Sequence, residues 1–344
     1  MPPVRILVAG AGLIGRTHVQ RILAEPEAAL AGIVDPTPEA EALARKHGVP
    51  WGADLAPMLA LAKPDAVIVA TPNALHVPMG LACIVAGLPM LLEKPVADTV
   101  DGAWSLVAAA EKAGVPVLVG HHHRHSPFIA AAKETVASGR LGRLVTVNAL
   151  TWFLKPADYF DTAWRRAPGG GPILINLIHL IDDLRNLCGD IAEVQAVASN
   201  AVRGFPVEDT AAMILRFRNG ALGTVSLSDT VASPWSWELT AGEYKAYPQT
   251  DQFCILLAGT EGALSVPRLE HWRHEGARGW WSPIQATRIT APEQDPLALQ
   301  LRHFCSVVRG QAKPLIDARE GTRTLEATLA VKQAAETGRA VRLD

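Results

Sequence analysis

Short apolar runs alternate with helix-like segments over the first 120 residues, and this alternation constrains the fold more than any other feature of the sequence. The runs occupy residues 4–10, 30–35, 66–70, 89–94 and 116–120. Their apolar residues are consecutive, whereas a strand with one solvated face alternates apolar and polar residues. Helices that connect such strands cover both faces of a parallel sheet. We therefore predict that the chain begins with a doubly wound, parallel α/β domain.

The pattern changes after residue 120 and predicts a second domain. Strand-like runs with few helices between them occupy residues 143–152, 194–202, 210–218, 221–229, 235–242 and 254–259. The Asn219-Gly220 pair is a strong hairpin signal, and residues 259–262 are a second turn candidate. Within residues 235–239 the alternation predicts a strand, with Trp235 and Trp237 on one face. We expect an α+β domain with a large, mostly antiparallel open sheet.

Three helices complete the second part of the predicted fold, over residues 127–138, 296–309 and 319–337. Leu297, Leu301 and Phe304 recur at helical spacing in the second of them. The predicted domains are residues 1–122 and residues 123–344. The last helix is a candidate to pack back on the first domain.

Charge balance and cysteine spacing indicate the environment in which the protein works. The chain holds 32 Lys and Arg against 34 Asp and Glu, a formal net charge of −2. This balance supports neither general nucleic-acid binding nor charge-driven membrane binding. No apolar run approaches the ~20 residues of a membrane-spanning helix, and the N-terminus lacks the apolar region of a secretory signal. The four cysteines lie far apart without a C-x-x-C pair, so we expect a cytoplasmic protein.

A glycine motif at the end of the first predicted strand indicates a dinucleotide site. Gly10, Gly12 and Gly15 fit the pattern G-x-G-x-x-G and open a predicted helix. The first glycine permits a tight turn, the second lets a pyrophosphate approach the backbone, and the third lets helix and strand pack closely. Asp35 ends the second strand, 35 − 15 = 20 residues after the last glycine, where a carboxylate holds the adenosine ribose.

The same carboxylate indicates which dinucleotide is preferred. Asp35 would repel a 2′-phosphate, and the nearest cations, Arg45 and Lys46, lie a helix away. We therefore expect NAD, with NADP as the alternative.

Polar residues also gather where other strands end or turn. They lie in TPNALH (71–76), EKP (93–95), GHHHRHSP (120–127) and GGGPILINLIHLIDDL (169–184). With the glycine motif, these segments resemble the Gfo/Idh/MocA family of oxidoreductases over essentially the whole chain. The resemblance implies a Rossmann domain followed by a domain whose open sheet often forms homodimers or homotetramers. It also implies that Lys94 lies beside nicotinamide and substrate and that His179 is the catalytic base.

The chemistry of these two side chains agrees with that implication. Oxidation of an alcohol requires a base for the hydroxyl proton, and a histidine, with an ordinary pKa near 6.5, suits neutral pH. An ammonium group stabilises the developing alkoxide. The chain departs from the family at Ile175, where many members have an aspartate. Asn176 is the candidate replacement, and Asp182 or Asp183 could orient His179.

The candidate site residues form three groups. The expected catalytic residues are Lys94, His179 and Asn176. The expected cofactor contacts are Gly10, Gly12, Leu13, Ile14, Gly15, Asp35, Thr71, Asn73, His76, Glu93 and Lys94. The expected substrate contacts are His123, Arg124, Trp164, Arg165 and Asn176.

Two of these segments admit other interpretations. His121, His123 and His125 would share one face of a strand, but no nearby carboxylate or cysteine completes a metal site, so we expect no metal. Residues 151–171 are either a surface loop or a segment that wraps the substrate. If several of their cations face the site beside Arg124, the substrate carries a carboxylate.

The predicted function is an NAD-dependent dehydrogenase that acts on a secondary alcohol of a sugar, cyclitol, sugar acid or related diol. Two alternatives remain: an enzyme that retains its cofactor and uses transient oxidation to cleave glycosidic bonds or exchange sugars, and a catalytically silent dinucleotide sensor. Lys94 and His179 argue against the sensor, which needs neither.

Overall fold

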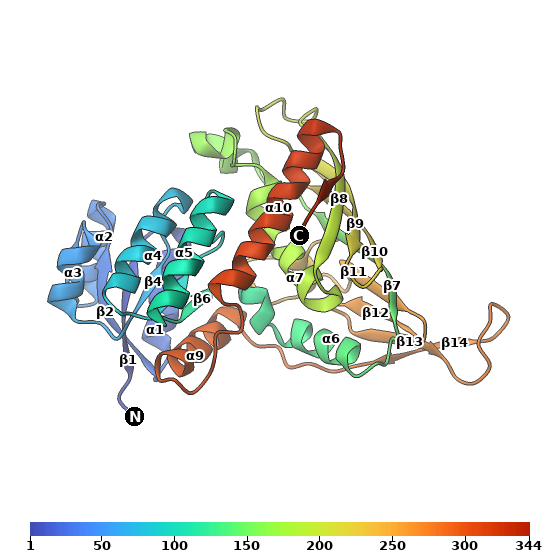
Figure 1. Ribbon diagram of the computed structural model, residues 1–344, viewed down its shortest axis with the longest axis horizontal. Helices are drawn as coiled ribbons and strands as arrows, with labels where there is room; N and C mark the ends of the chain where they lie inside the picture. The colour runs from blue at the N-terminus through green and yellow to red at the C-terminus, as the bar shows by residue number, and fades with distance from the viewer. The chain divides into compact units, whose positions relative to one another are not determined.

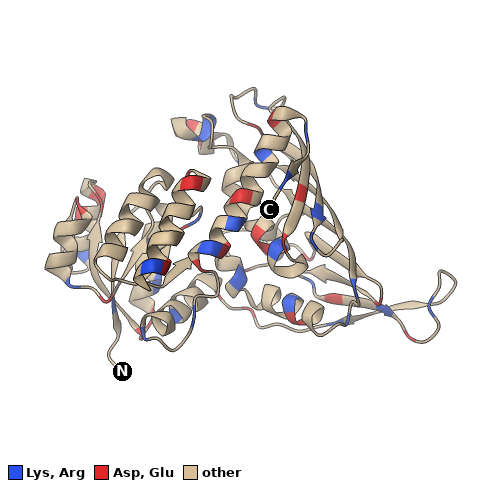
Figure 2. Ribbon diagram, in the orientation of Figure 1, with Lys and Arg blue, Asp and Glu red and all other residues tan.

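The computed structural model describes residues 1–344 and divides into two compact units. Unit 1 comprises Met1–His122 and Pro296–Leu325, and unit 2 comprises His123–Asp295 and Glu326–Asp344. The long helix α10 (Ala318–Thr337) contributes to both units. No helix combines the length and the apolar character needed to cross a membrane. Acidic and basic residues are interspersed along the elements of each unit (Figure 2).

Unit 1 contains the predicted parallel sheet. Its strand order is β3-β2-β1-β4-β5-β6, which is that of a Rossmann fold. The strands are β1 (Val4–Ala9), β2 (Ala28–Val34), β3 (Trp51–Gly52), β4 (Ala66–Val69), β5 (Met90–Leu92) and β6 (Val117–Val119), and all neighbours are parallel. The order reverses between β1 and β4, where doubly wound sheets bind ligands at the carboxyl ends of their strands.

Helices cover both faces of this sheet (Figure 1). They are α1 (Leu13–Ala24), α2 (Pro38–Lys46), α3 (Leu55–Ala62), α4 (His76–Val85), α5 (Val100–Ala113) and α9 (Pro296–Val308). Successive strand residues point to opposite faces. Ile6 and Val8 pack with residues of α1, α2 and α9, whereas Leu7 faces Met58 of α3. Because both faces are buried, the strands are apolar apart from Arg5 of β1.

Unit 2 contains the predicted open sheet, with the order β14-β13-β12-β11-β7-β10-β9-β8-β15. The strands are β7 (Leu144–Trp152), β8 (Ile191–Ser199), β9 (Thr210–Phe217), β10 (Leu222–Ser228), β11 (Ile255–Gly259), β12 (Ala263–Val266), β13 (Glu270–His274), β14 (Ile284–Arg288) and β15 (Val341–Arg342). All neighbours are antiparallel except β7 and β10. Both predicted turns are confirmed, the first joining β9 to β10 and the second joining β11 to β12.

One face of the second sheet is covered and the other is open. Helices α6 (Pro127–Ala137) and α7 (Ile178–Cys188) and the end of α10 pack their buried apolar residues against the covered face. On the opposite face Val197, Ile214 and Leu222 are 47–68% exposed. The strands therefore alternate buried and exposed residues, as expected for a sheet with one solvated face.

Two local predictions were wrong. Trp237–Thr240 form a short helix, α8, instead of a strand. Local hydrogen bonds accompany this helix: Trp237 Nε1 donates to Glu243, and Thr240 Oγ1 donates to the Ser236 carbonyl. His122–His125 form a 3-10 turn, so the alternating histidines do not share the face of a strand.

Candidate active site

The glycine turn between β1 and α1 leaves the helix N-terminus open. Gly10 has φ +95°, and a Cβ there would lie 2.4 Å from the Ala70 carbonyl oxygen. A Cβ on Gly15 would lie 1.9 Å from the Gly10 carbonyl oxygen, so both positions require glycine. Gly12 is different, because a Cβ there would meet nothing within 4 Å. Gly12 is the N-cap residue of α1 and has no side chain that could accept hydrogen bonds from the first turn. The backbone N–H donors of that turn are therefore available to an anion.

Asp35 lies beside this turn, as predicted. Its Oδ2 accepts from the Ala11 backbone at 2.8 Å, and its Oδ1 accepts from the backbone and hydroxyl of Thr37 at 2.9 and 2.5 Å. Burial by itself would raise the pKa of Asp35, but the bonds from Thr37 and Ala11, with the charge of Arg16, hold it below its ordinary value. The carboxylate is therefore ionised and fixed against the glycine turn.

The loops after β4 and β5 carry the next predicted contacts. Thr71 follows β4 and its hydroxyl is buried without a hydrogen-bond partner. Asn73 opens a 3-10 turn two residues later. His76 is 1% exposed, and its two ring nitrogens contact the carbonyl oxygens of Pro95 and Thr71 at 2.6 and 2.9 Å. His76 therefore connects the two loops, and its contact with a cofactor stays a prediction.

Glu93 also supports the site from within the protein. It is 6% exposed, and its oxygens accept from His18 at 2.7 Å and from the Lys94 backbone at 3.2 Å. Burial would raise the pKa of Glu93, but the bond from His18 and the charges of His18 and Lys94 hold it below its usual range. Glu93 thus holds the backbone N–H of Lys94, and its contact with a cofactor stays a prediction.

In unit 2, the segment before α7 positions Asn176 and His179. Ile173–Leu177 form a π-helical turn that leads into α7. The carboxylate of Glu208 accepts from the Ile173 backbone at 3.0 Å, and a Cβ on Gly171 would lie 2.1 Å from it. Gly171 is therefore required for the approach of Glu208. Asn176 and His179 line the same small cavity.

The acids of α7 do not bond His179, contrary to one of our expectations. Asp183 accepts from His123 Nδ1 at 2.9 Å, and both groups are buried. Burial by itself would lower the pKa of His123, but the Asp183 carboxylate raises it above its ordinary value. The His123 ring stacks on His179 with centroids 4.8 Å apart. Asp183 therefore contacts the His123 ring that stacks on His179.

Asp182 pairs with Arg124 in a bidentate arrangement. Arg124 Nε and Nη2 each lie 2.8 Å from a carboxylate oxygen, and the side chains are 7% and 1% exposed. These two hydrogen bonds hold the 3-10 turn of residues 122–125 against α7. The structure gives no support for the expected substrate contact of Arg124.

Lys155 is a cation of the 151–171 segment, which could wrap the substrate, but it was not among the expected substrate contacts. It is 8% exposed and donates to Asn176 Oδ1 at 2.8 Å, with Asp229 Oδ2 at 3.1 Å. Burial lowers the pKa of Lys155, and Asp229 partly offsets this effect. An ammonium group only donates, so the Asn176 oxygen must face it and the Asn176 amino group must face away.

The other predicted substrate contacts lie on two 3-10 turns after β7. Arg165 donates to the Tyr159 carbonyl at 2.7 Å and lies 4.0 Å above the Tyr159 ring. Trp164 is 55% exposed. Tyr159 also stacks against Lys155, whose Nζ is 4.8 Å from the ring centre. Arg165 thus supports Lys155 through Tyr159.

No group of three or more His, Cys, Asp or Glu side chains is arranged to hold a metal ion.

Comparison with known proteins identifies the family of this chain. Residues 4–121 match the model of an oxidoreductase family with an NAD-binding Rossmann fold. Residues 129–265 match the model of the GFO/IDH/MocA C-terminal domain. The chain belongs to the Gfo/Idh/MocA family.

Relatives extend over nearly the whole chain. The rhizopine catabolism protein MocA of Rhizobium meliloti is 26% identical over 320 residues, 91% of this chain and 89% of that protein. The scyllo-inositol 2-dehydrogenase (NAD(+)) of Bacillus subtilis is 26% identical and the match covers 99% of this chain and 96% of that enzyme. The WlbA dehydrogenase of Bordetella pertussis, solved with NADH and UDP-GlcNAcA, matches with a TM-score of 0.81 at 26% identity over 99% of both chains. This Gfo/Idh/MocA member is therefore an NAD-binding oxidoreductase, with named dehydrogenases among its relatives.

Proposed function

We propose that this protein is an NAD-dependent dehydrogenase that transfers hydride between the nicotinamide and a secondary alcohol of a sugar or cyclitol. The observation that carries the proposal is the uncapped N-terminus of α1 at Gly12, with the ionised Asp35 fixed beside it. This arrangement fits a dinucleotide, because helix donors suit its pyrophosphate and a carboxylate suits its ribose diol. The relatives named above support sugars and cyclitols as the substrate class.

The cofactor would be held by unit 1. Gly10, Gly12 and Gly15 permit the approach of the pyrophosphate, with the backbone donors of Leu13 and Ile14 facing it. The unpartnered hydroxyl of Thr71 and the side chain of Asn73 would contact the nicotinamide half. The bound nicotinamide supplies a hydride acceptor, or a donor in the reverse direction. Asp35 favours NAD over NADP, since a carboxylate repels a 2′-phosphate.

Three side chains would serve the reacting alcohol. The His179 imidazole would take the hydroxyl proton as the carbon–hydrogen bond breaks. The Lys94 ammonium would stabilise negative charge on the oxygen. Glu93 accepts a hydrogen bond from the Lys94 backbone and so holds this residue in place. The Asn176 amino group, which Lys155 turns away from itself, would donate a hydrogen bond to a substrate oxygen.

The structure does not favour a carboxylated substrate. Arg124 is bonded to Asp182, Lys155 to Asp229, and Arg165 to Tyr159. The cations that suggested a carboxylate are therefore engaged by the protein. We propose a substrate that is bound through hydroxyl groups.

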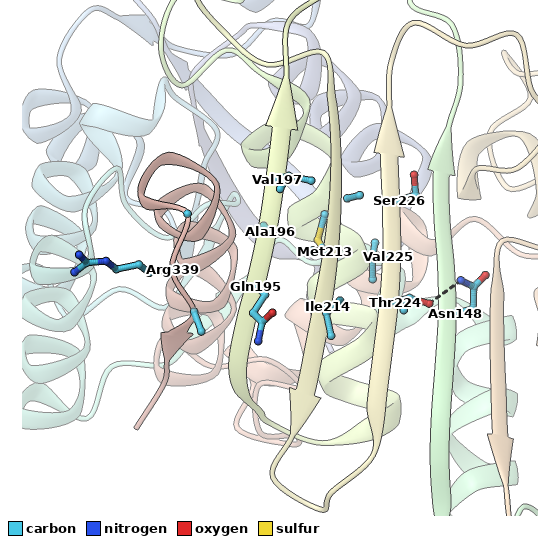
Figure 3. Close-up of a pocket in the computed structure, with 13 residues that line it drawn as sticks. Asn148, Gln195, Ala196, Val197, Met213, Ile214, Thr224, Val225, Ser226 and Arg339 are labelled. Carbon is cyan, nitrogen blue, oxygen red and sulfur yellow. Dashed lines mark hydrogen bonds between the residues drawn. The ribbon is translucent and has the colours of Figure 1, made fainter.

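The open face of the second sheet is proposed as a surface for self-association into a dimer or tetramer. A groove of about 540 Å³ crosses β8, β9 and β10 on this face, lined by Val197, Ile214 and Thr224 among others (Figure 3). Exposed apolar side chains on a sheet face are typical of an interface. The four buried free cysteines support a reducing compartment, the cytoplasm.

A spectrophotometric screen tests the proposed function. Purified protein is mixed with NAD+ or NADP+ and with matched sugars, cyclitols, sugar acids and cis-diols, and the absorbance of the reduced nicotinamide is followed. We expect turnover with a sugar or cyclitol and a preference for NAD+. Binding of NADH without turnover of any compound, in either direction, would contradict the proposal.

A further inference from the structure

The small cavity beside His179 contains carboxylate oxygens that the protein itself does not satisfy. Asp183 is 1% exposed, and while one of its oxygens accepts from His123, Oδ1 is buried without a hydrogen-bond partner. Oε2 of Glu238, which lines the same cavity, is also buried without a partner. Such oxygens carry the full cost of lost hydration unless a donor reaches them.

The cavity has the size of one water molecule. The region in which the centre of a water molecule fits measures about 10 Å³, and one ordered water needs about that much room. A water needs two to four polar partners in such a place. It has two protons to donate, one for each of these carboxylate oxygens, and its lone pairs can accept from a ring N–H. The polar lining consists of Thr151, His123, Asn176, His179, Asp183 and Glu238.

We propose that this cavity is a binding site for one ordered water, which donates to Asp183 Oδ1 and Glu238 Oε2 and through which Asp183 positions His179. The part that concerns His179 rests on the function proposed above, whereas the water site does not. Asp183 is thus a positioning residue in a chain that has Ile175 where many relatives have an acid. It acts on His179 by two routes, the stacked ring of His123 and the water.

The charged groups around the cavity come from several elements. They are His123 in the 3-10 turn, Asp183 on α7, Glu238 on α8, Glu243 in the following segment and Lys155 after β7. The two acids with unpartnered oxygens favour the protonated form of a nearby imidazole. Neutralising either one should therefore weaken His179 as a base and extend activity to lower pH.

The water site is tested directly by a crystal structure of the wild-type protein at a resolution that shows ordered water. We expect one density peak within hydrogen-bond distance of Asp183 Oδ1 and Glu238 Oε2. Thr151→Ile adds a methylene to the cavity lining and should remove this peak, whereas the isosteric Thr151→Val should keep it. An empty cavity in the wild type would overturn the proposal, whatever the activity of the protein.

The positioning role is tested by kinetics. With the best substrate from the screen, Glu238→Gln and Thr151→Ile should each lower kcat about tenfold while KM and the NADH affinity stay unchanged. Glu238→Gln should also move the acid limb of the pH–rate profile down by about one pH unit. Glu261→Gln, the same change on an exposed turn away from the cavity, should have none of these effects.

Two outcomes would overturn the positioning role. One is an unchanged pH profile in Glu238→Gln, and the other is full turnover in Thr151→Ile with the water displaced. A merely structural role would lower the unfolding temperature without moving the acid limb. If the protein binds NADH and shows the water but oxidises no compound, the proposed function fails and the water site stands.

Discussion

Replacement of Asp35 by alanine tests the assignment of the dinucleotide site most directly. A carboxylate has roughly four lone-pair positions, and three hydrogen bonds from Ala11 and Thr37 already occupy Asp35. Room remains for about one strong bond to a ribose hydroxyl. A hydrogen bond to a charged group contributes about 1.5–3 kcal/mol, and 1.4 kcal/mol corresponds to about tenfold in affinity. Asp35→Ala should therefore raise the Kd for NADH roughly 10- to 150-fold.

NADPH should respond differently, because the same substitution removes the charge that repels its 2′-phosphate. We expect its Kd to stay level or fall, so that the preference for NADH shrinks. Calorimetric titration of both cofactors measures the two effects. Asp65→Ala is the matched control, because Asp65 accepts a backbone bond from Arg5 at the opposite end of β1. An unchanged NADH Kd in Asp35→Ala, or an equal rise in the NADH Kd in Asp65→Ala, would refute the reasoning.

Three further predictions concern catalysis and stability. His179→Ala should lower kcat by about 10²- to 10⁴-fold with the NADH Kd unchanged, and single-turnover kinetics beside calorimetry would show whether both hold. Glu93→Gln should lower the unfolding free energy by about 3 kcal/mol, since it breaks a buried charged pair with His18; urea denaturation measures it, and a loss near zero would contradict the ion pair. Asp183 raises the pKa of His123 in the folded state. The His123–Asp183 pair therefore contributes fully to the unfolding free energy below the ordinary histidine pKa of about 6.5, and this contribution is lost as pH rises through the folded-state pKa of His123. The unfolding free energy of the wild type should thus decline at alkaline pH relative to His123→Gln, and parallel curves would speak against the pair.

Unit 1 and its dinucleotide site could be predicted because the sequence signals for them are local. The strands of unit 1 are apolar runs bounded by glycine or polar turns, and the glycine motif lies next to the strand and helix that it joins. The sequence separation of Asp35 from the turn follows from the length of one βαβ unit. Only β3, a two-residue strand, is too short to leave a pattern.

The site residues of unit 2 could be predicted only in outline, because the residues that contact one another there are far apart in the sequence. His123 and Asp183 are 60 residues apart, and Lys155 and Asp229 are 74 apart. Spacing on one helix suggested Asp183 as the partner of His179, but it could not show that a histidine from another segment lies between them. Trp237 was misassigned for a different reason: the hydrogen bonds around its helix are local, but an alternation of apolar residues does not show them.

The environment of Asn176 shows how the departure at Ile175 changes the chemistry available to the site. An aspartate facing substrate can only accept hydrogen bonds when it is ionised. Here the nearest polar side chain on the turn is Asn176, and its oxygen is bound by the Lys155 ammonium at 2.8 Å. The group that remains for a ligand is therefore a donor, whereas the resemblance to the family implied an acidic acceptor one residue earlier, at Ile175. Such a donor suits the lone pairs of a hydroxyl or carbonyl oxygen, so it can bind alcohol and ketone alike. In the proposal above, the acidic function passes to Asp183, which acts on His179 through the ring of His123 and the ordered water.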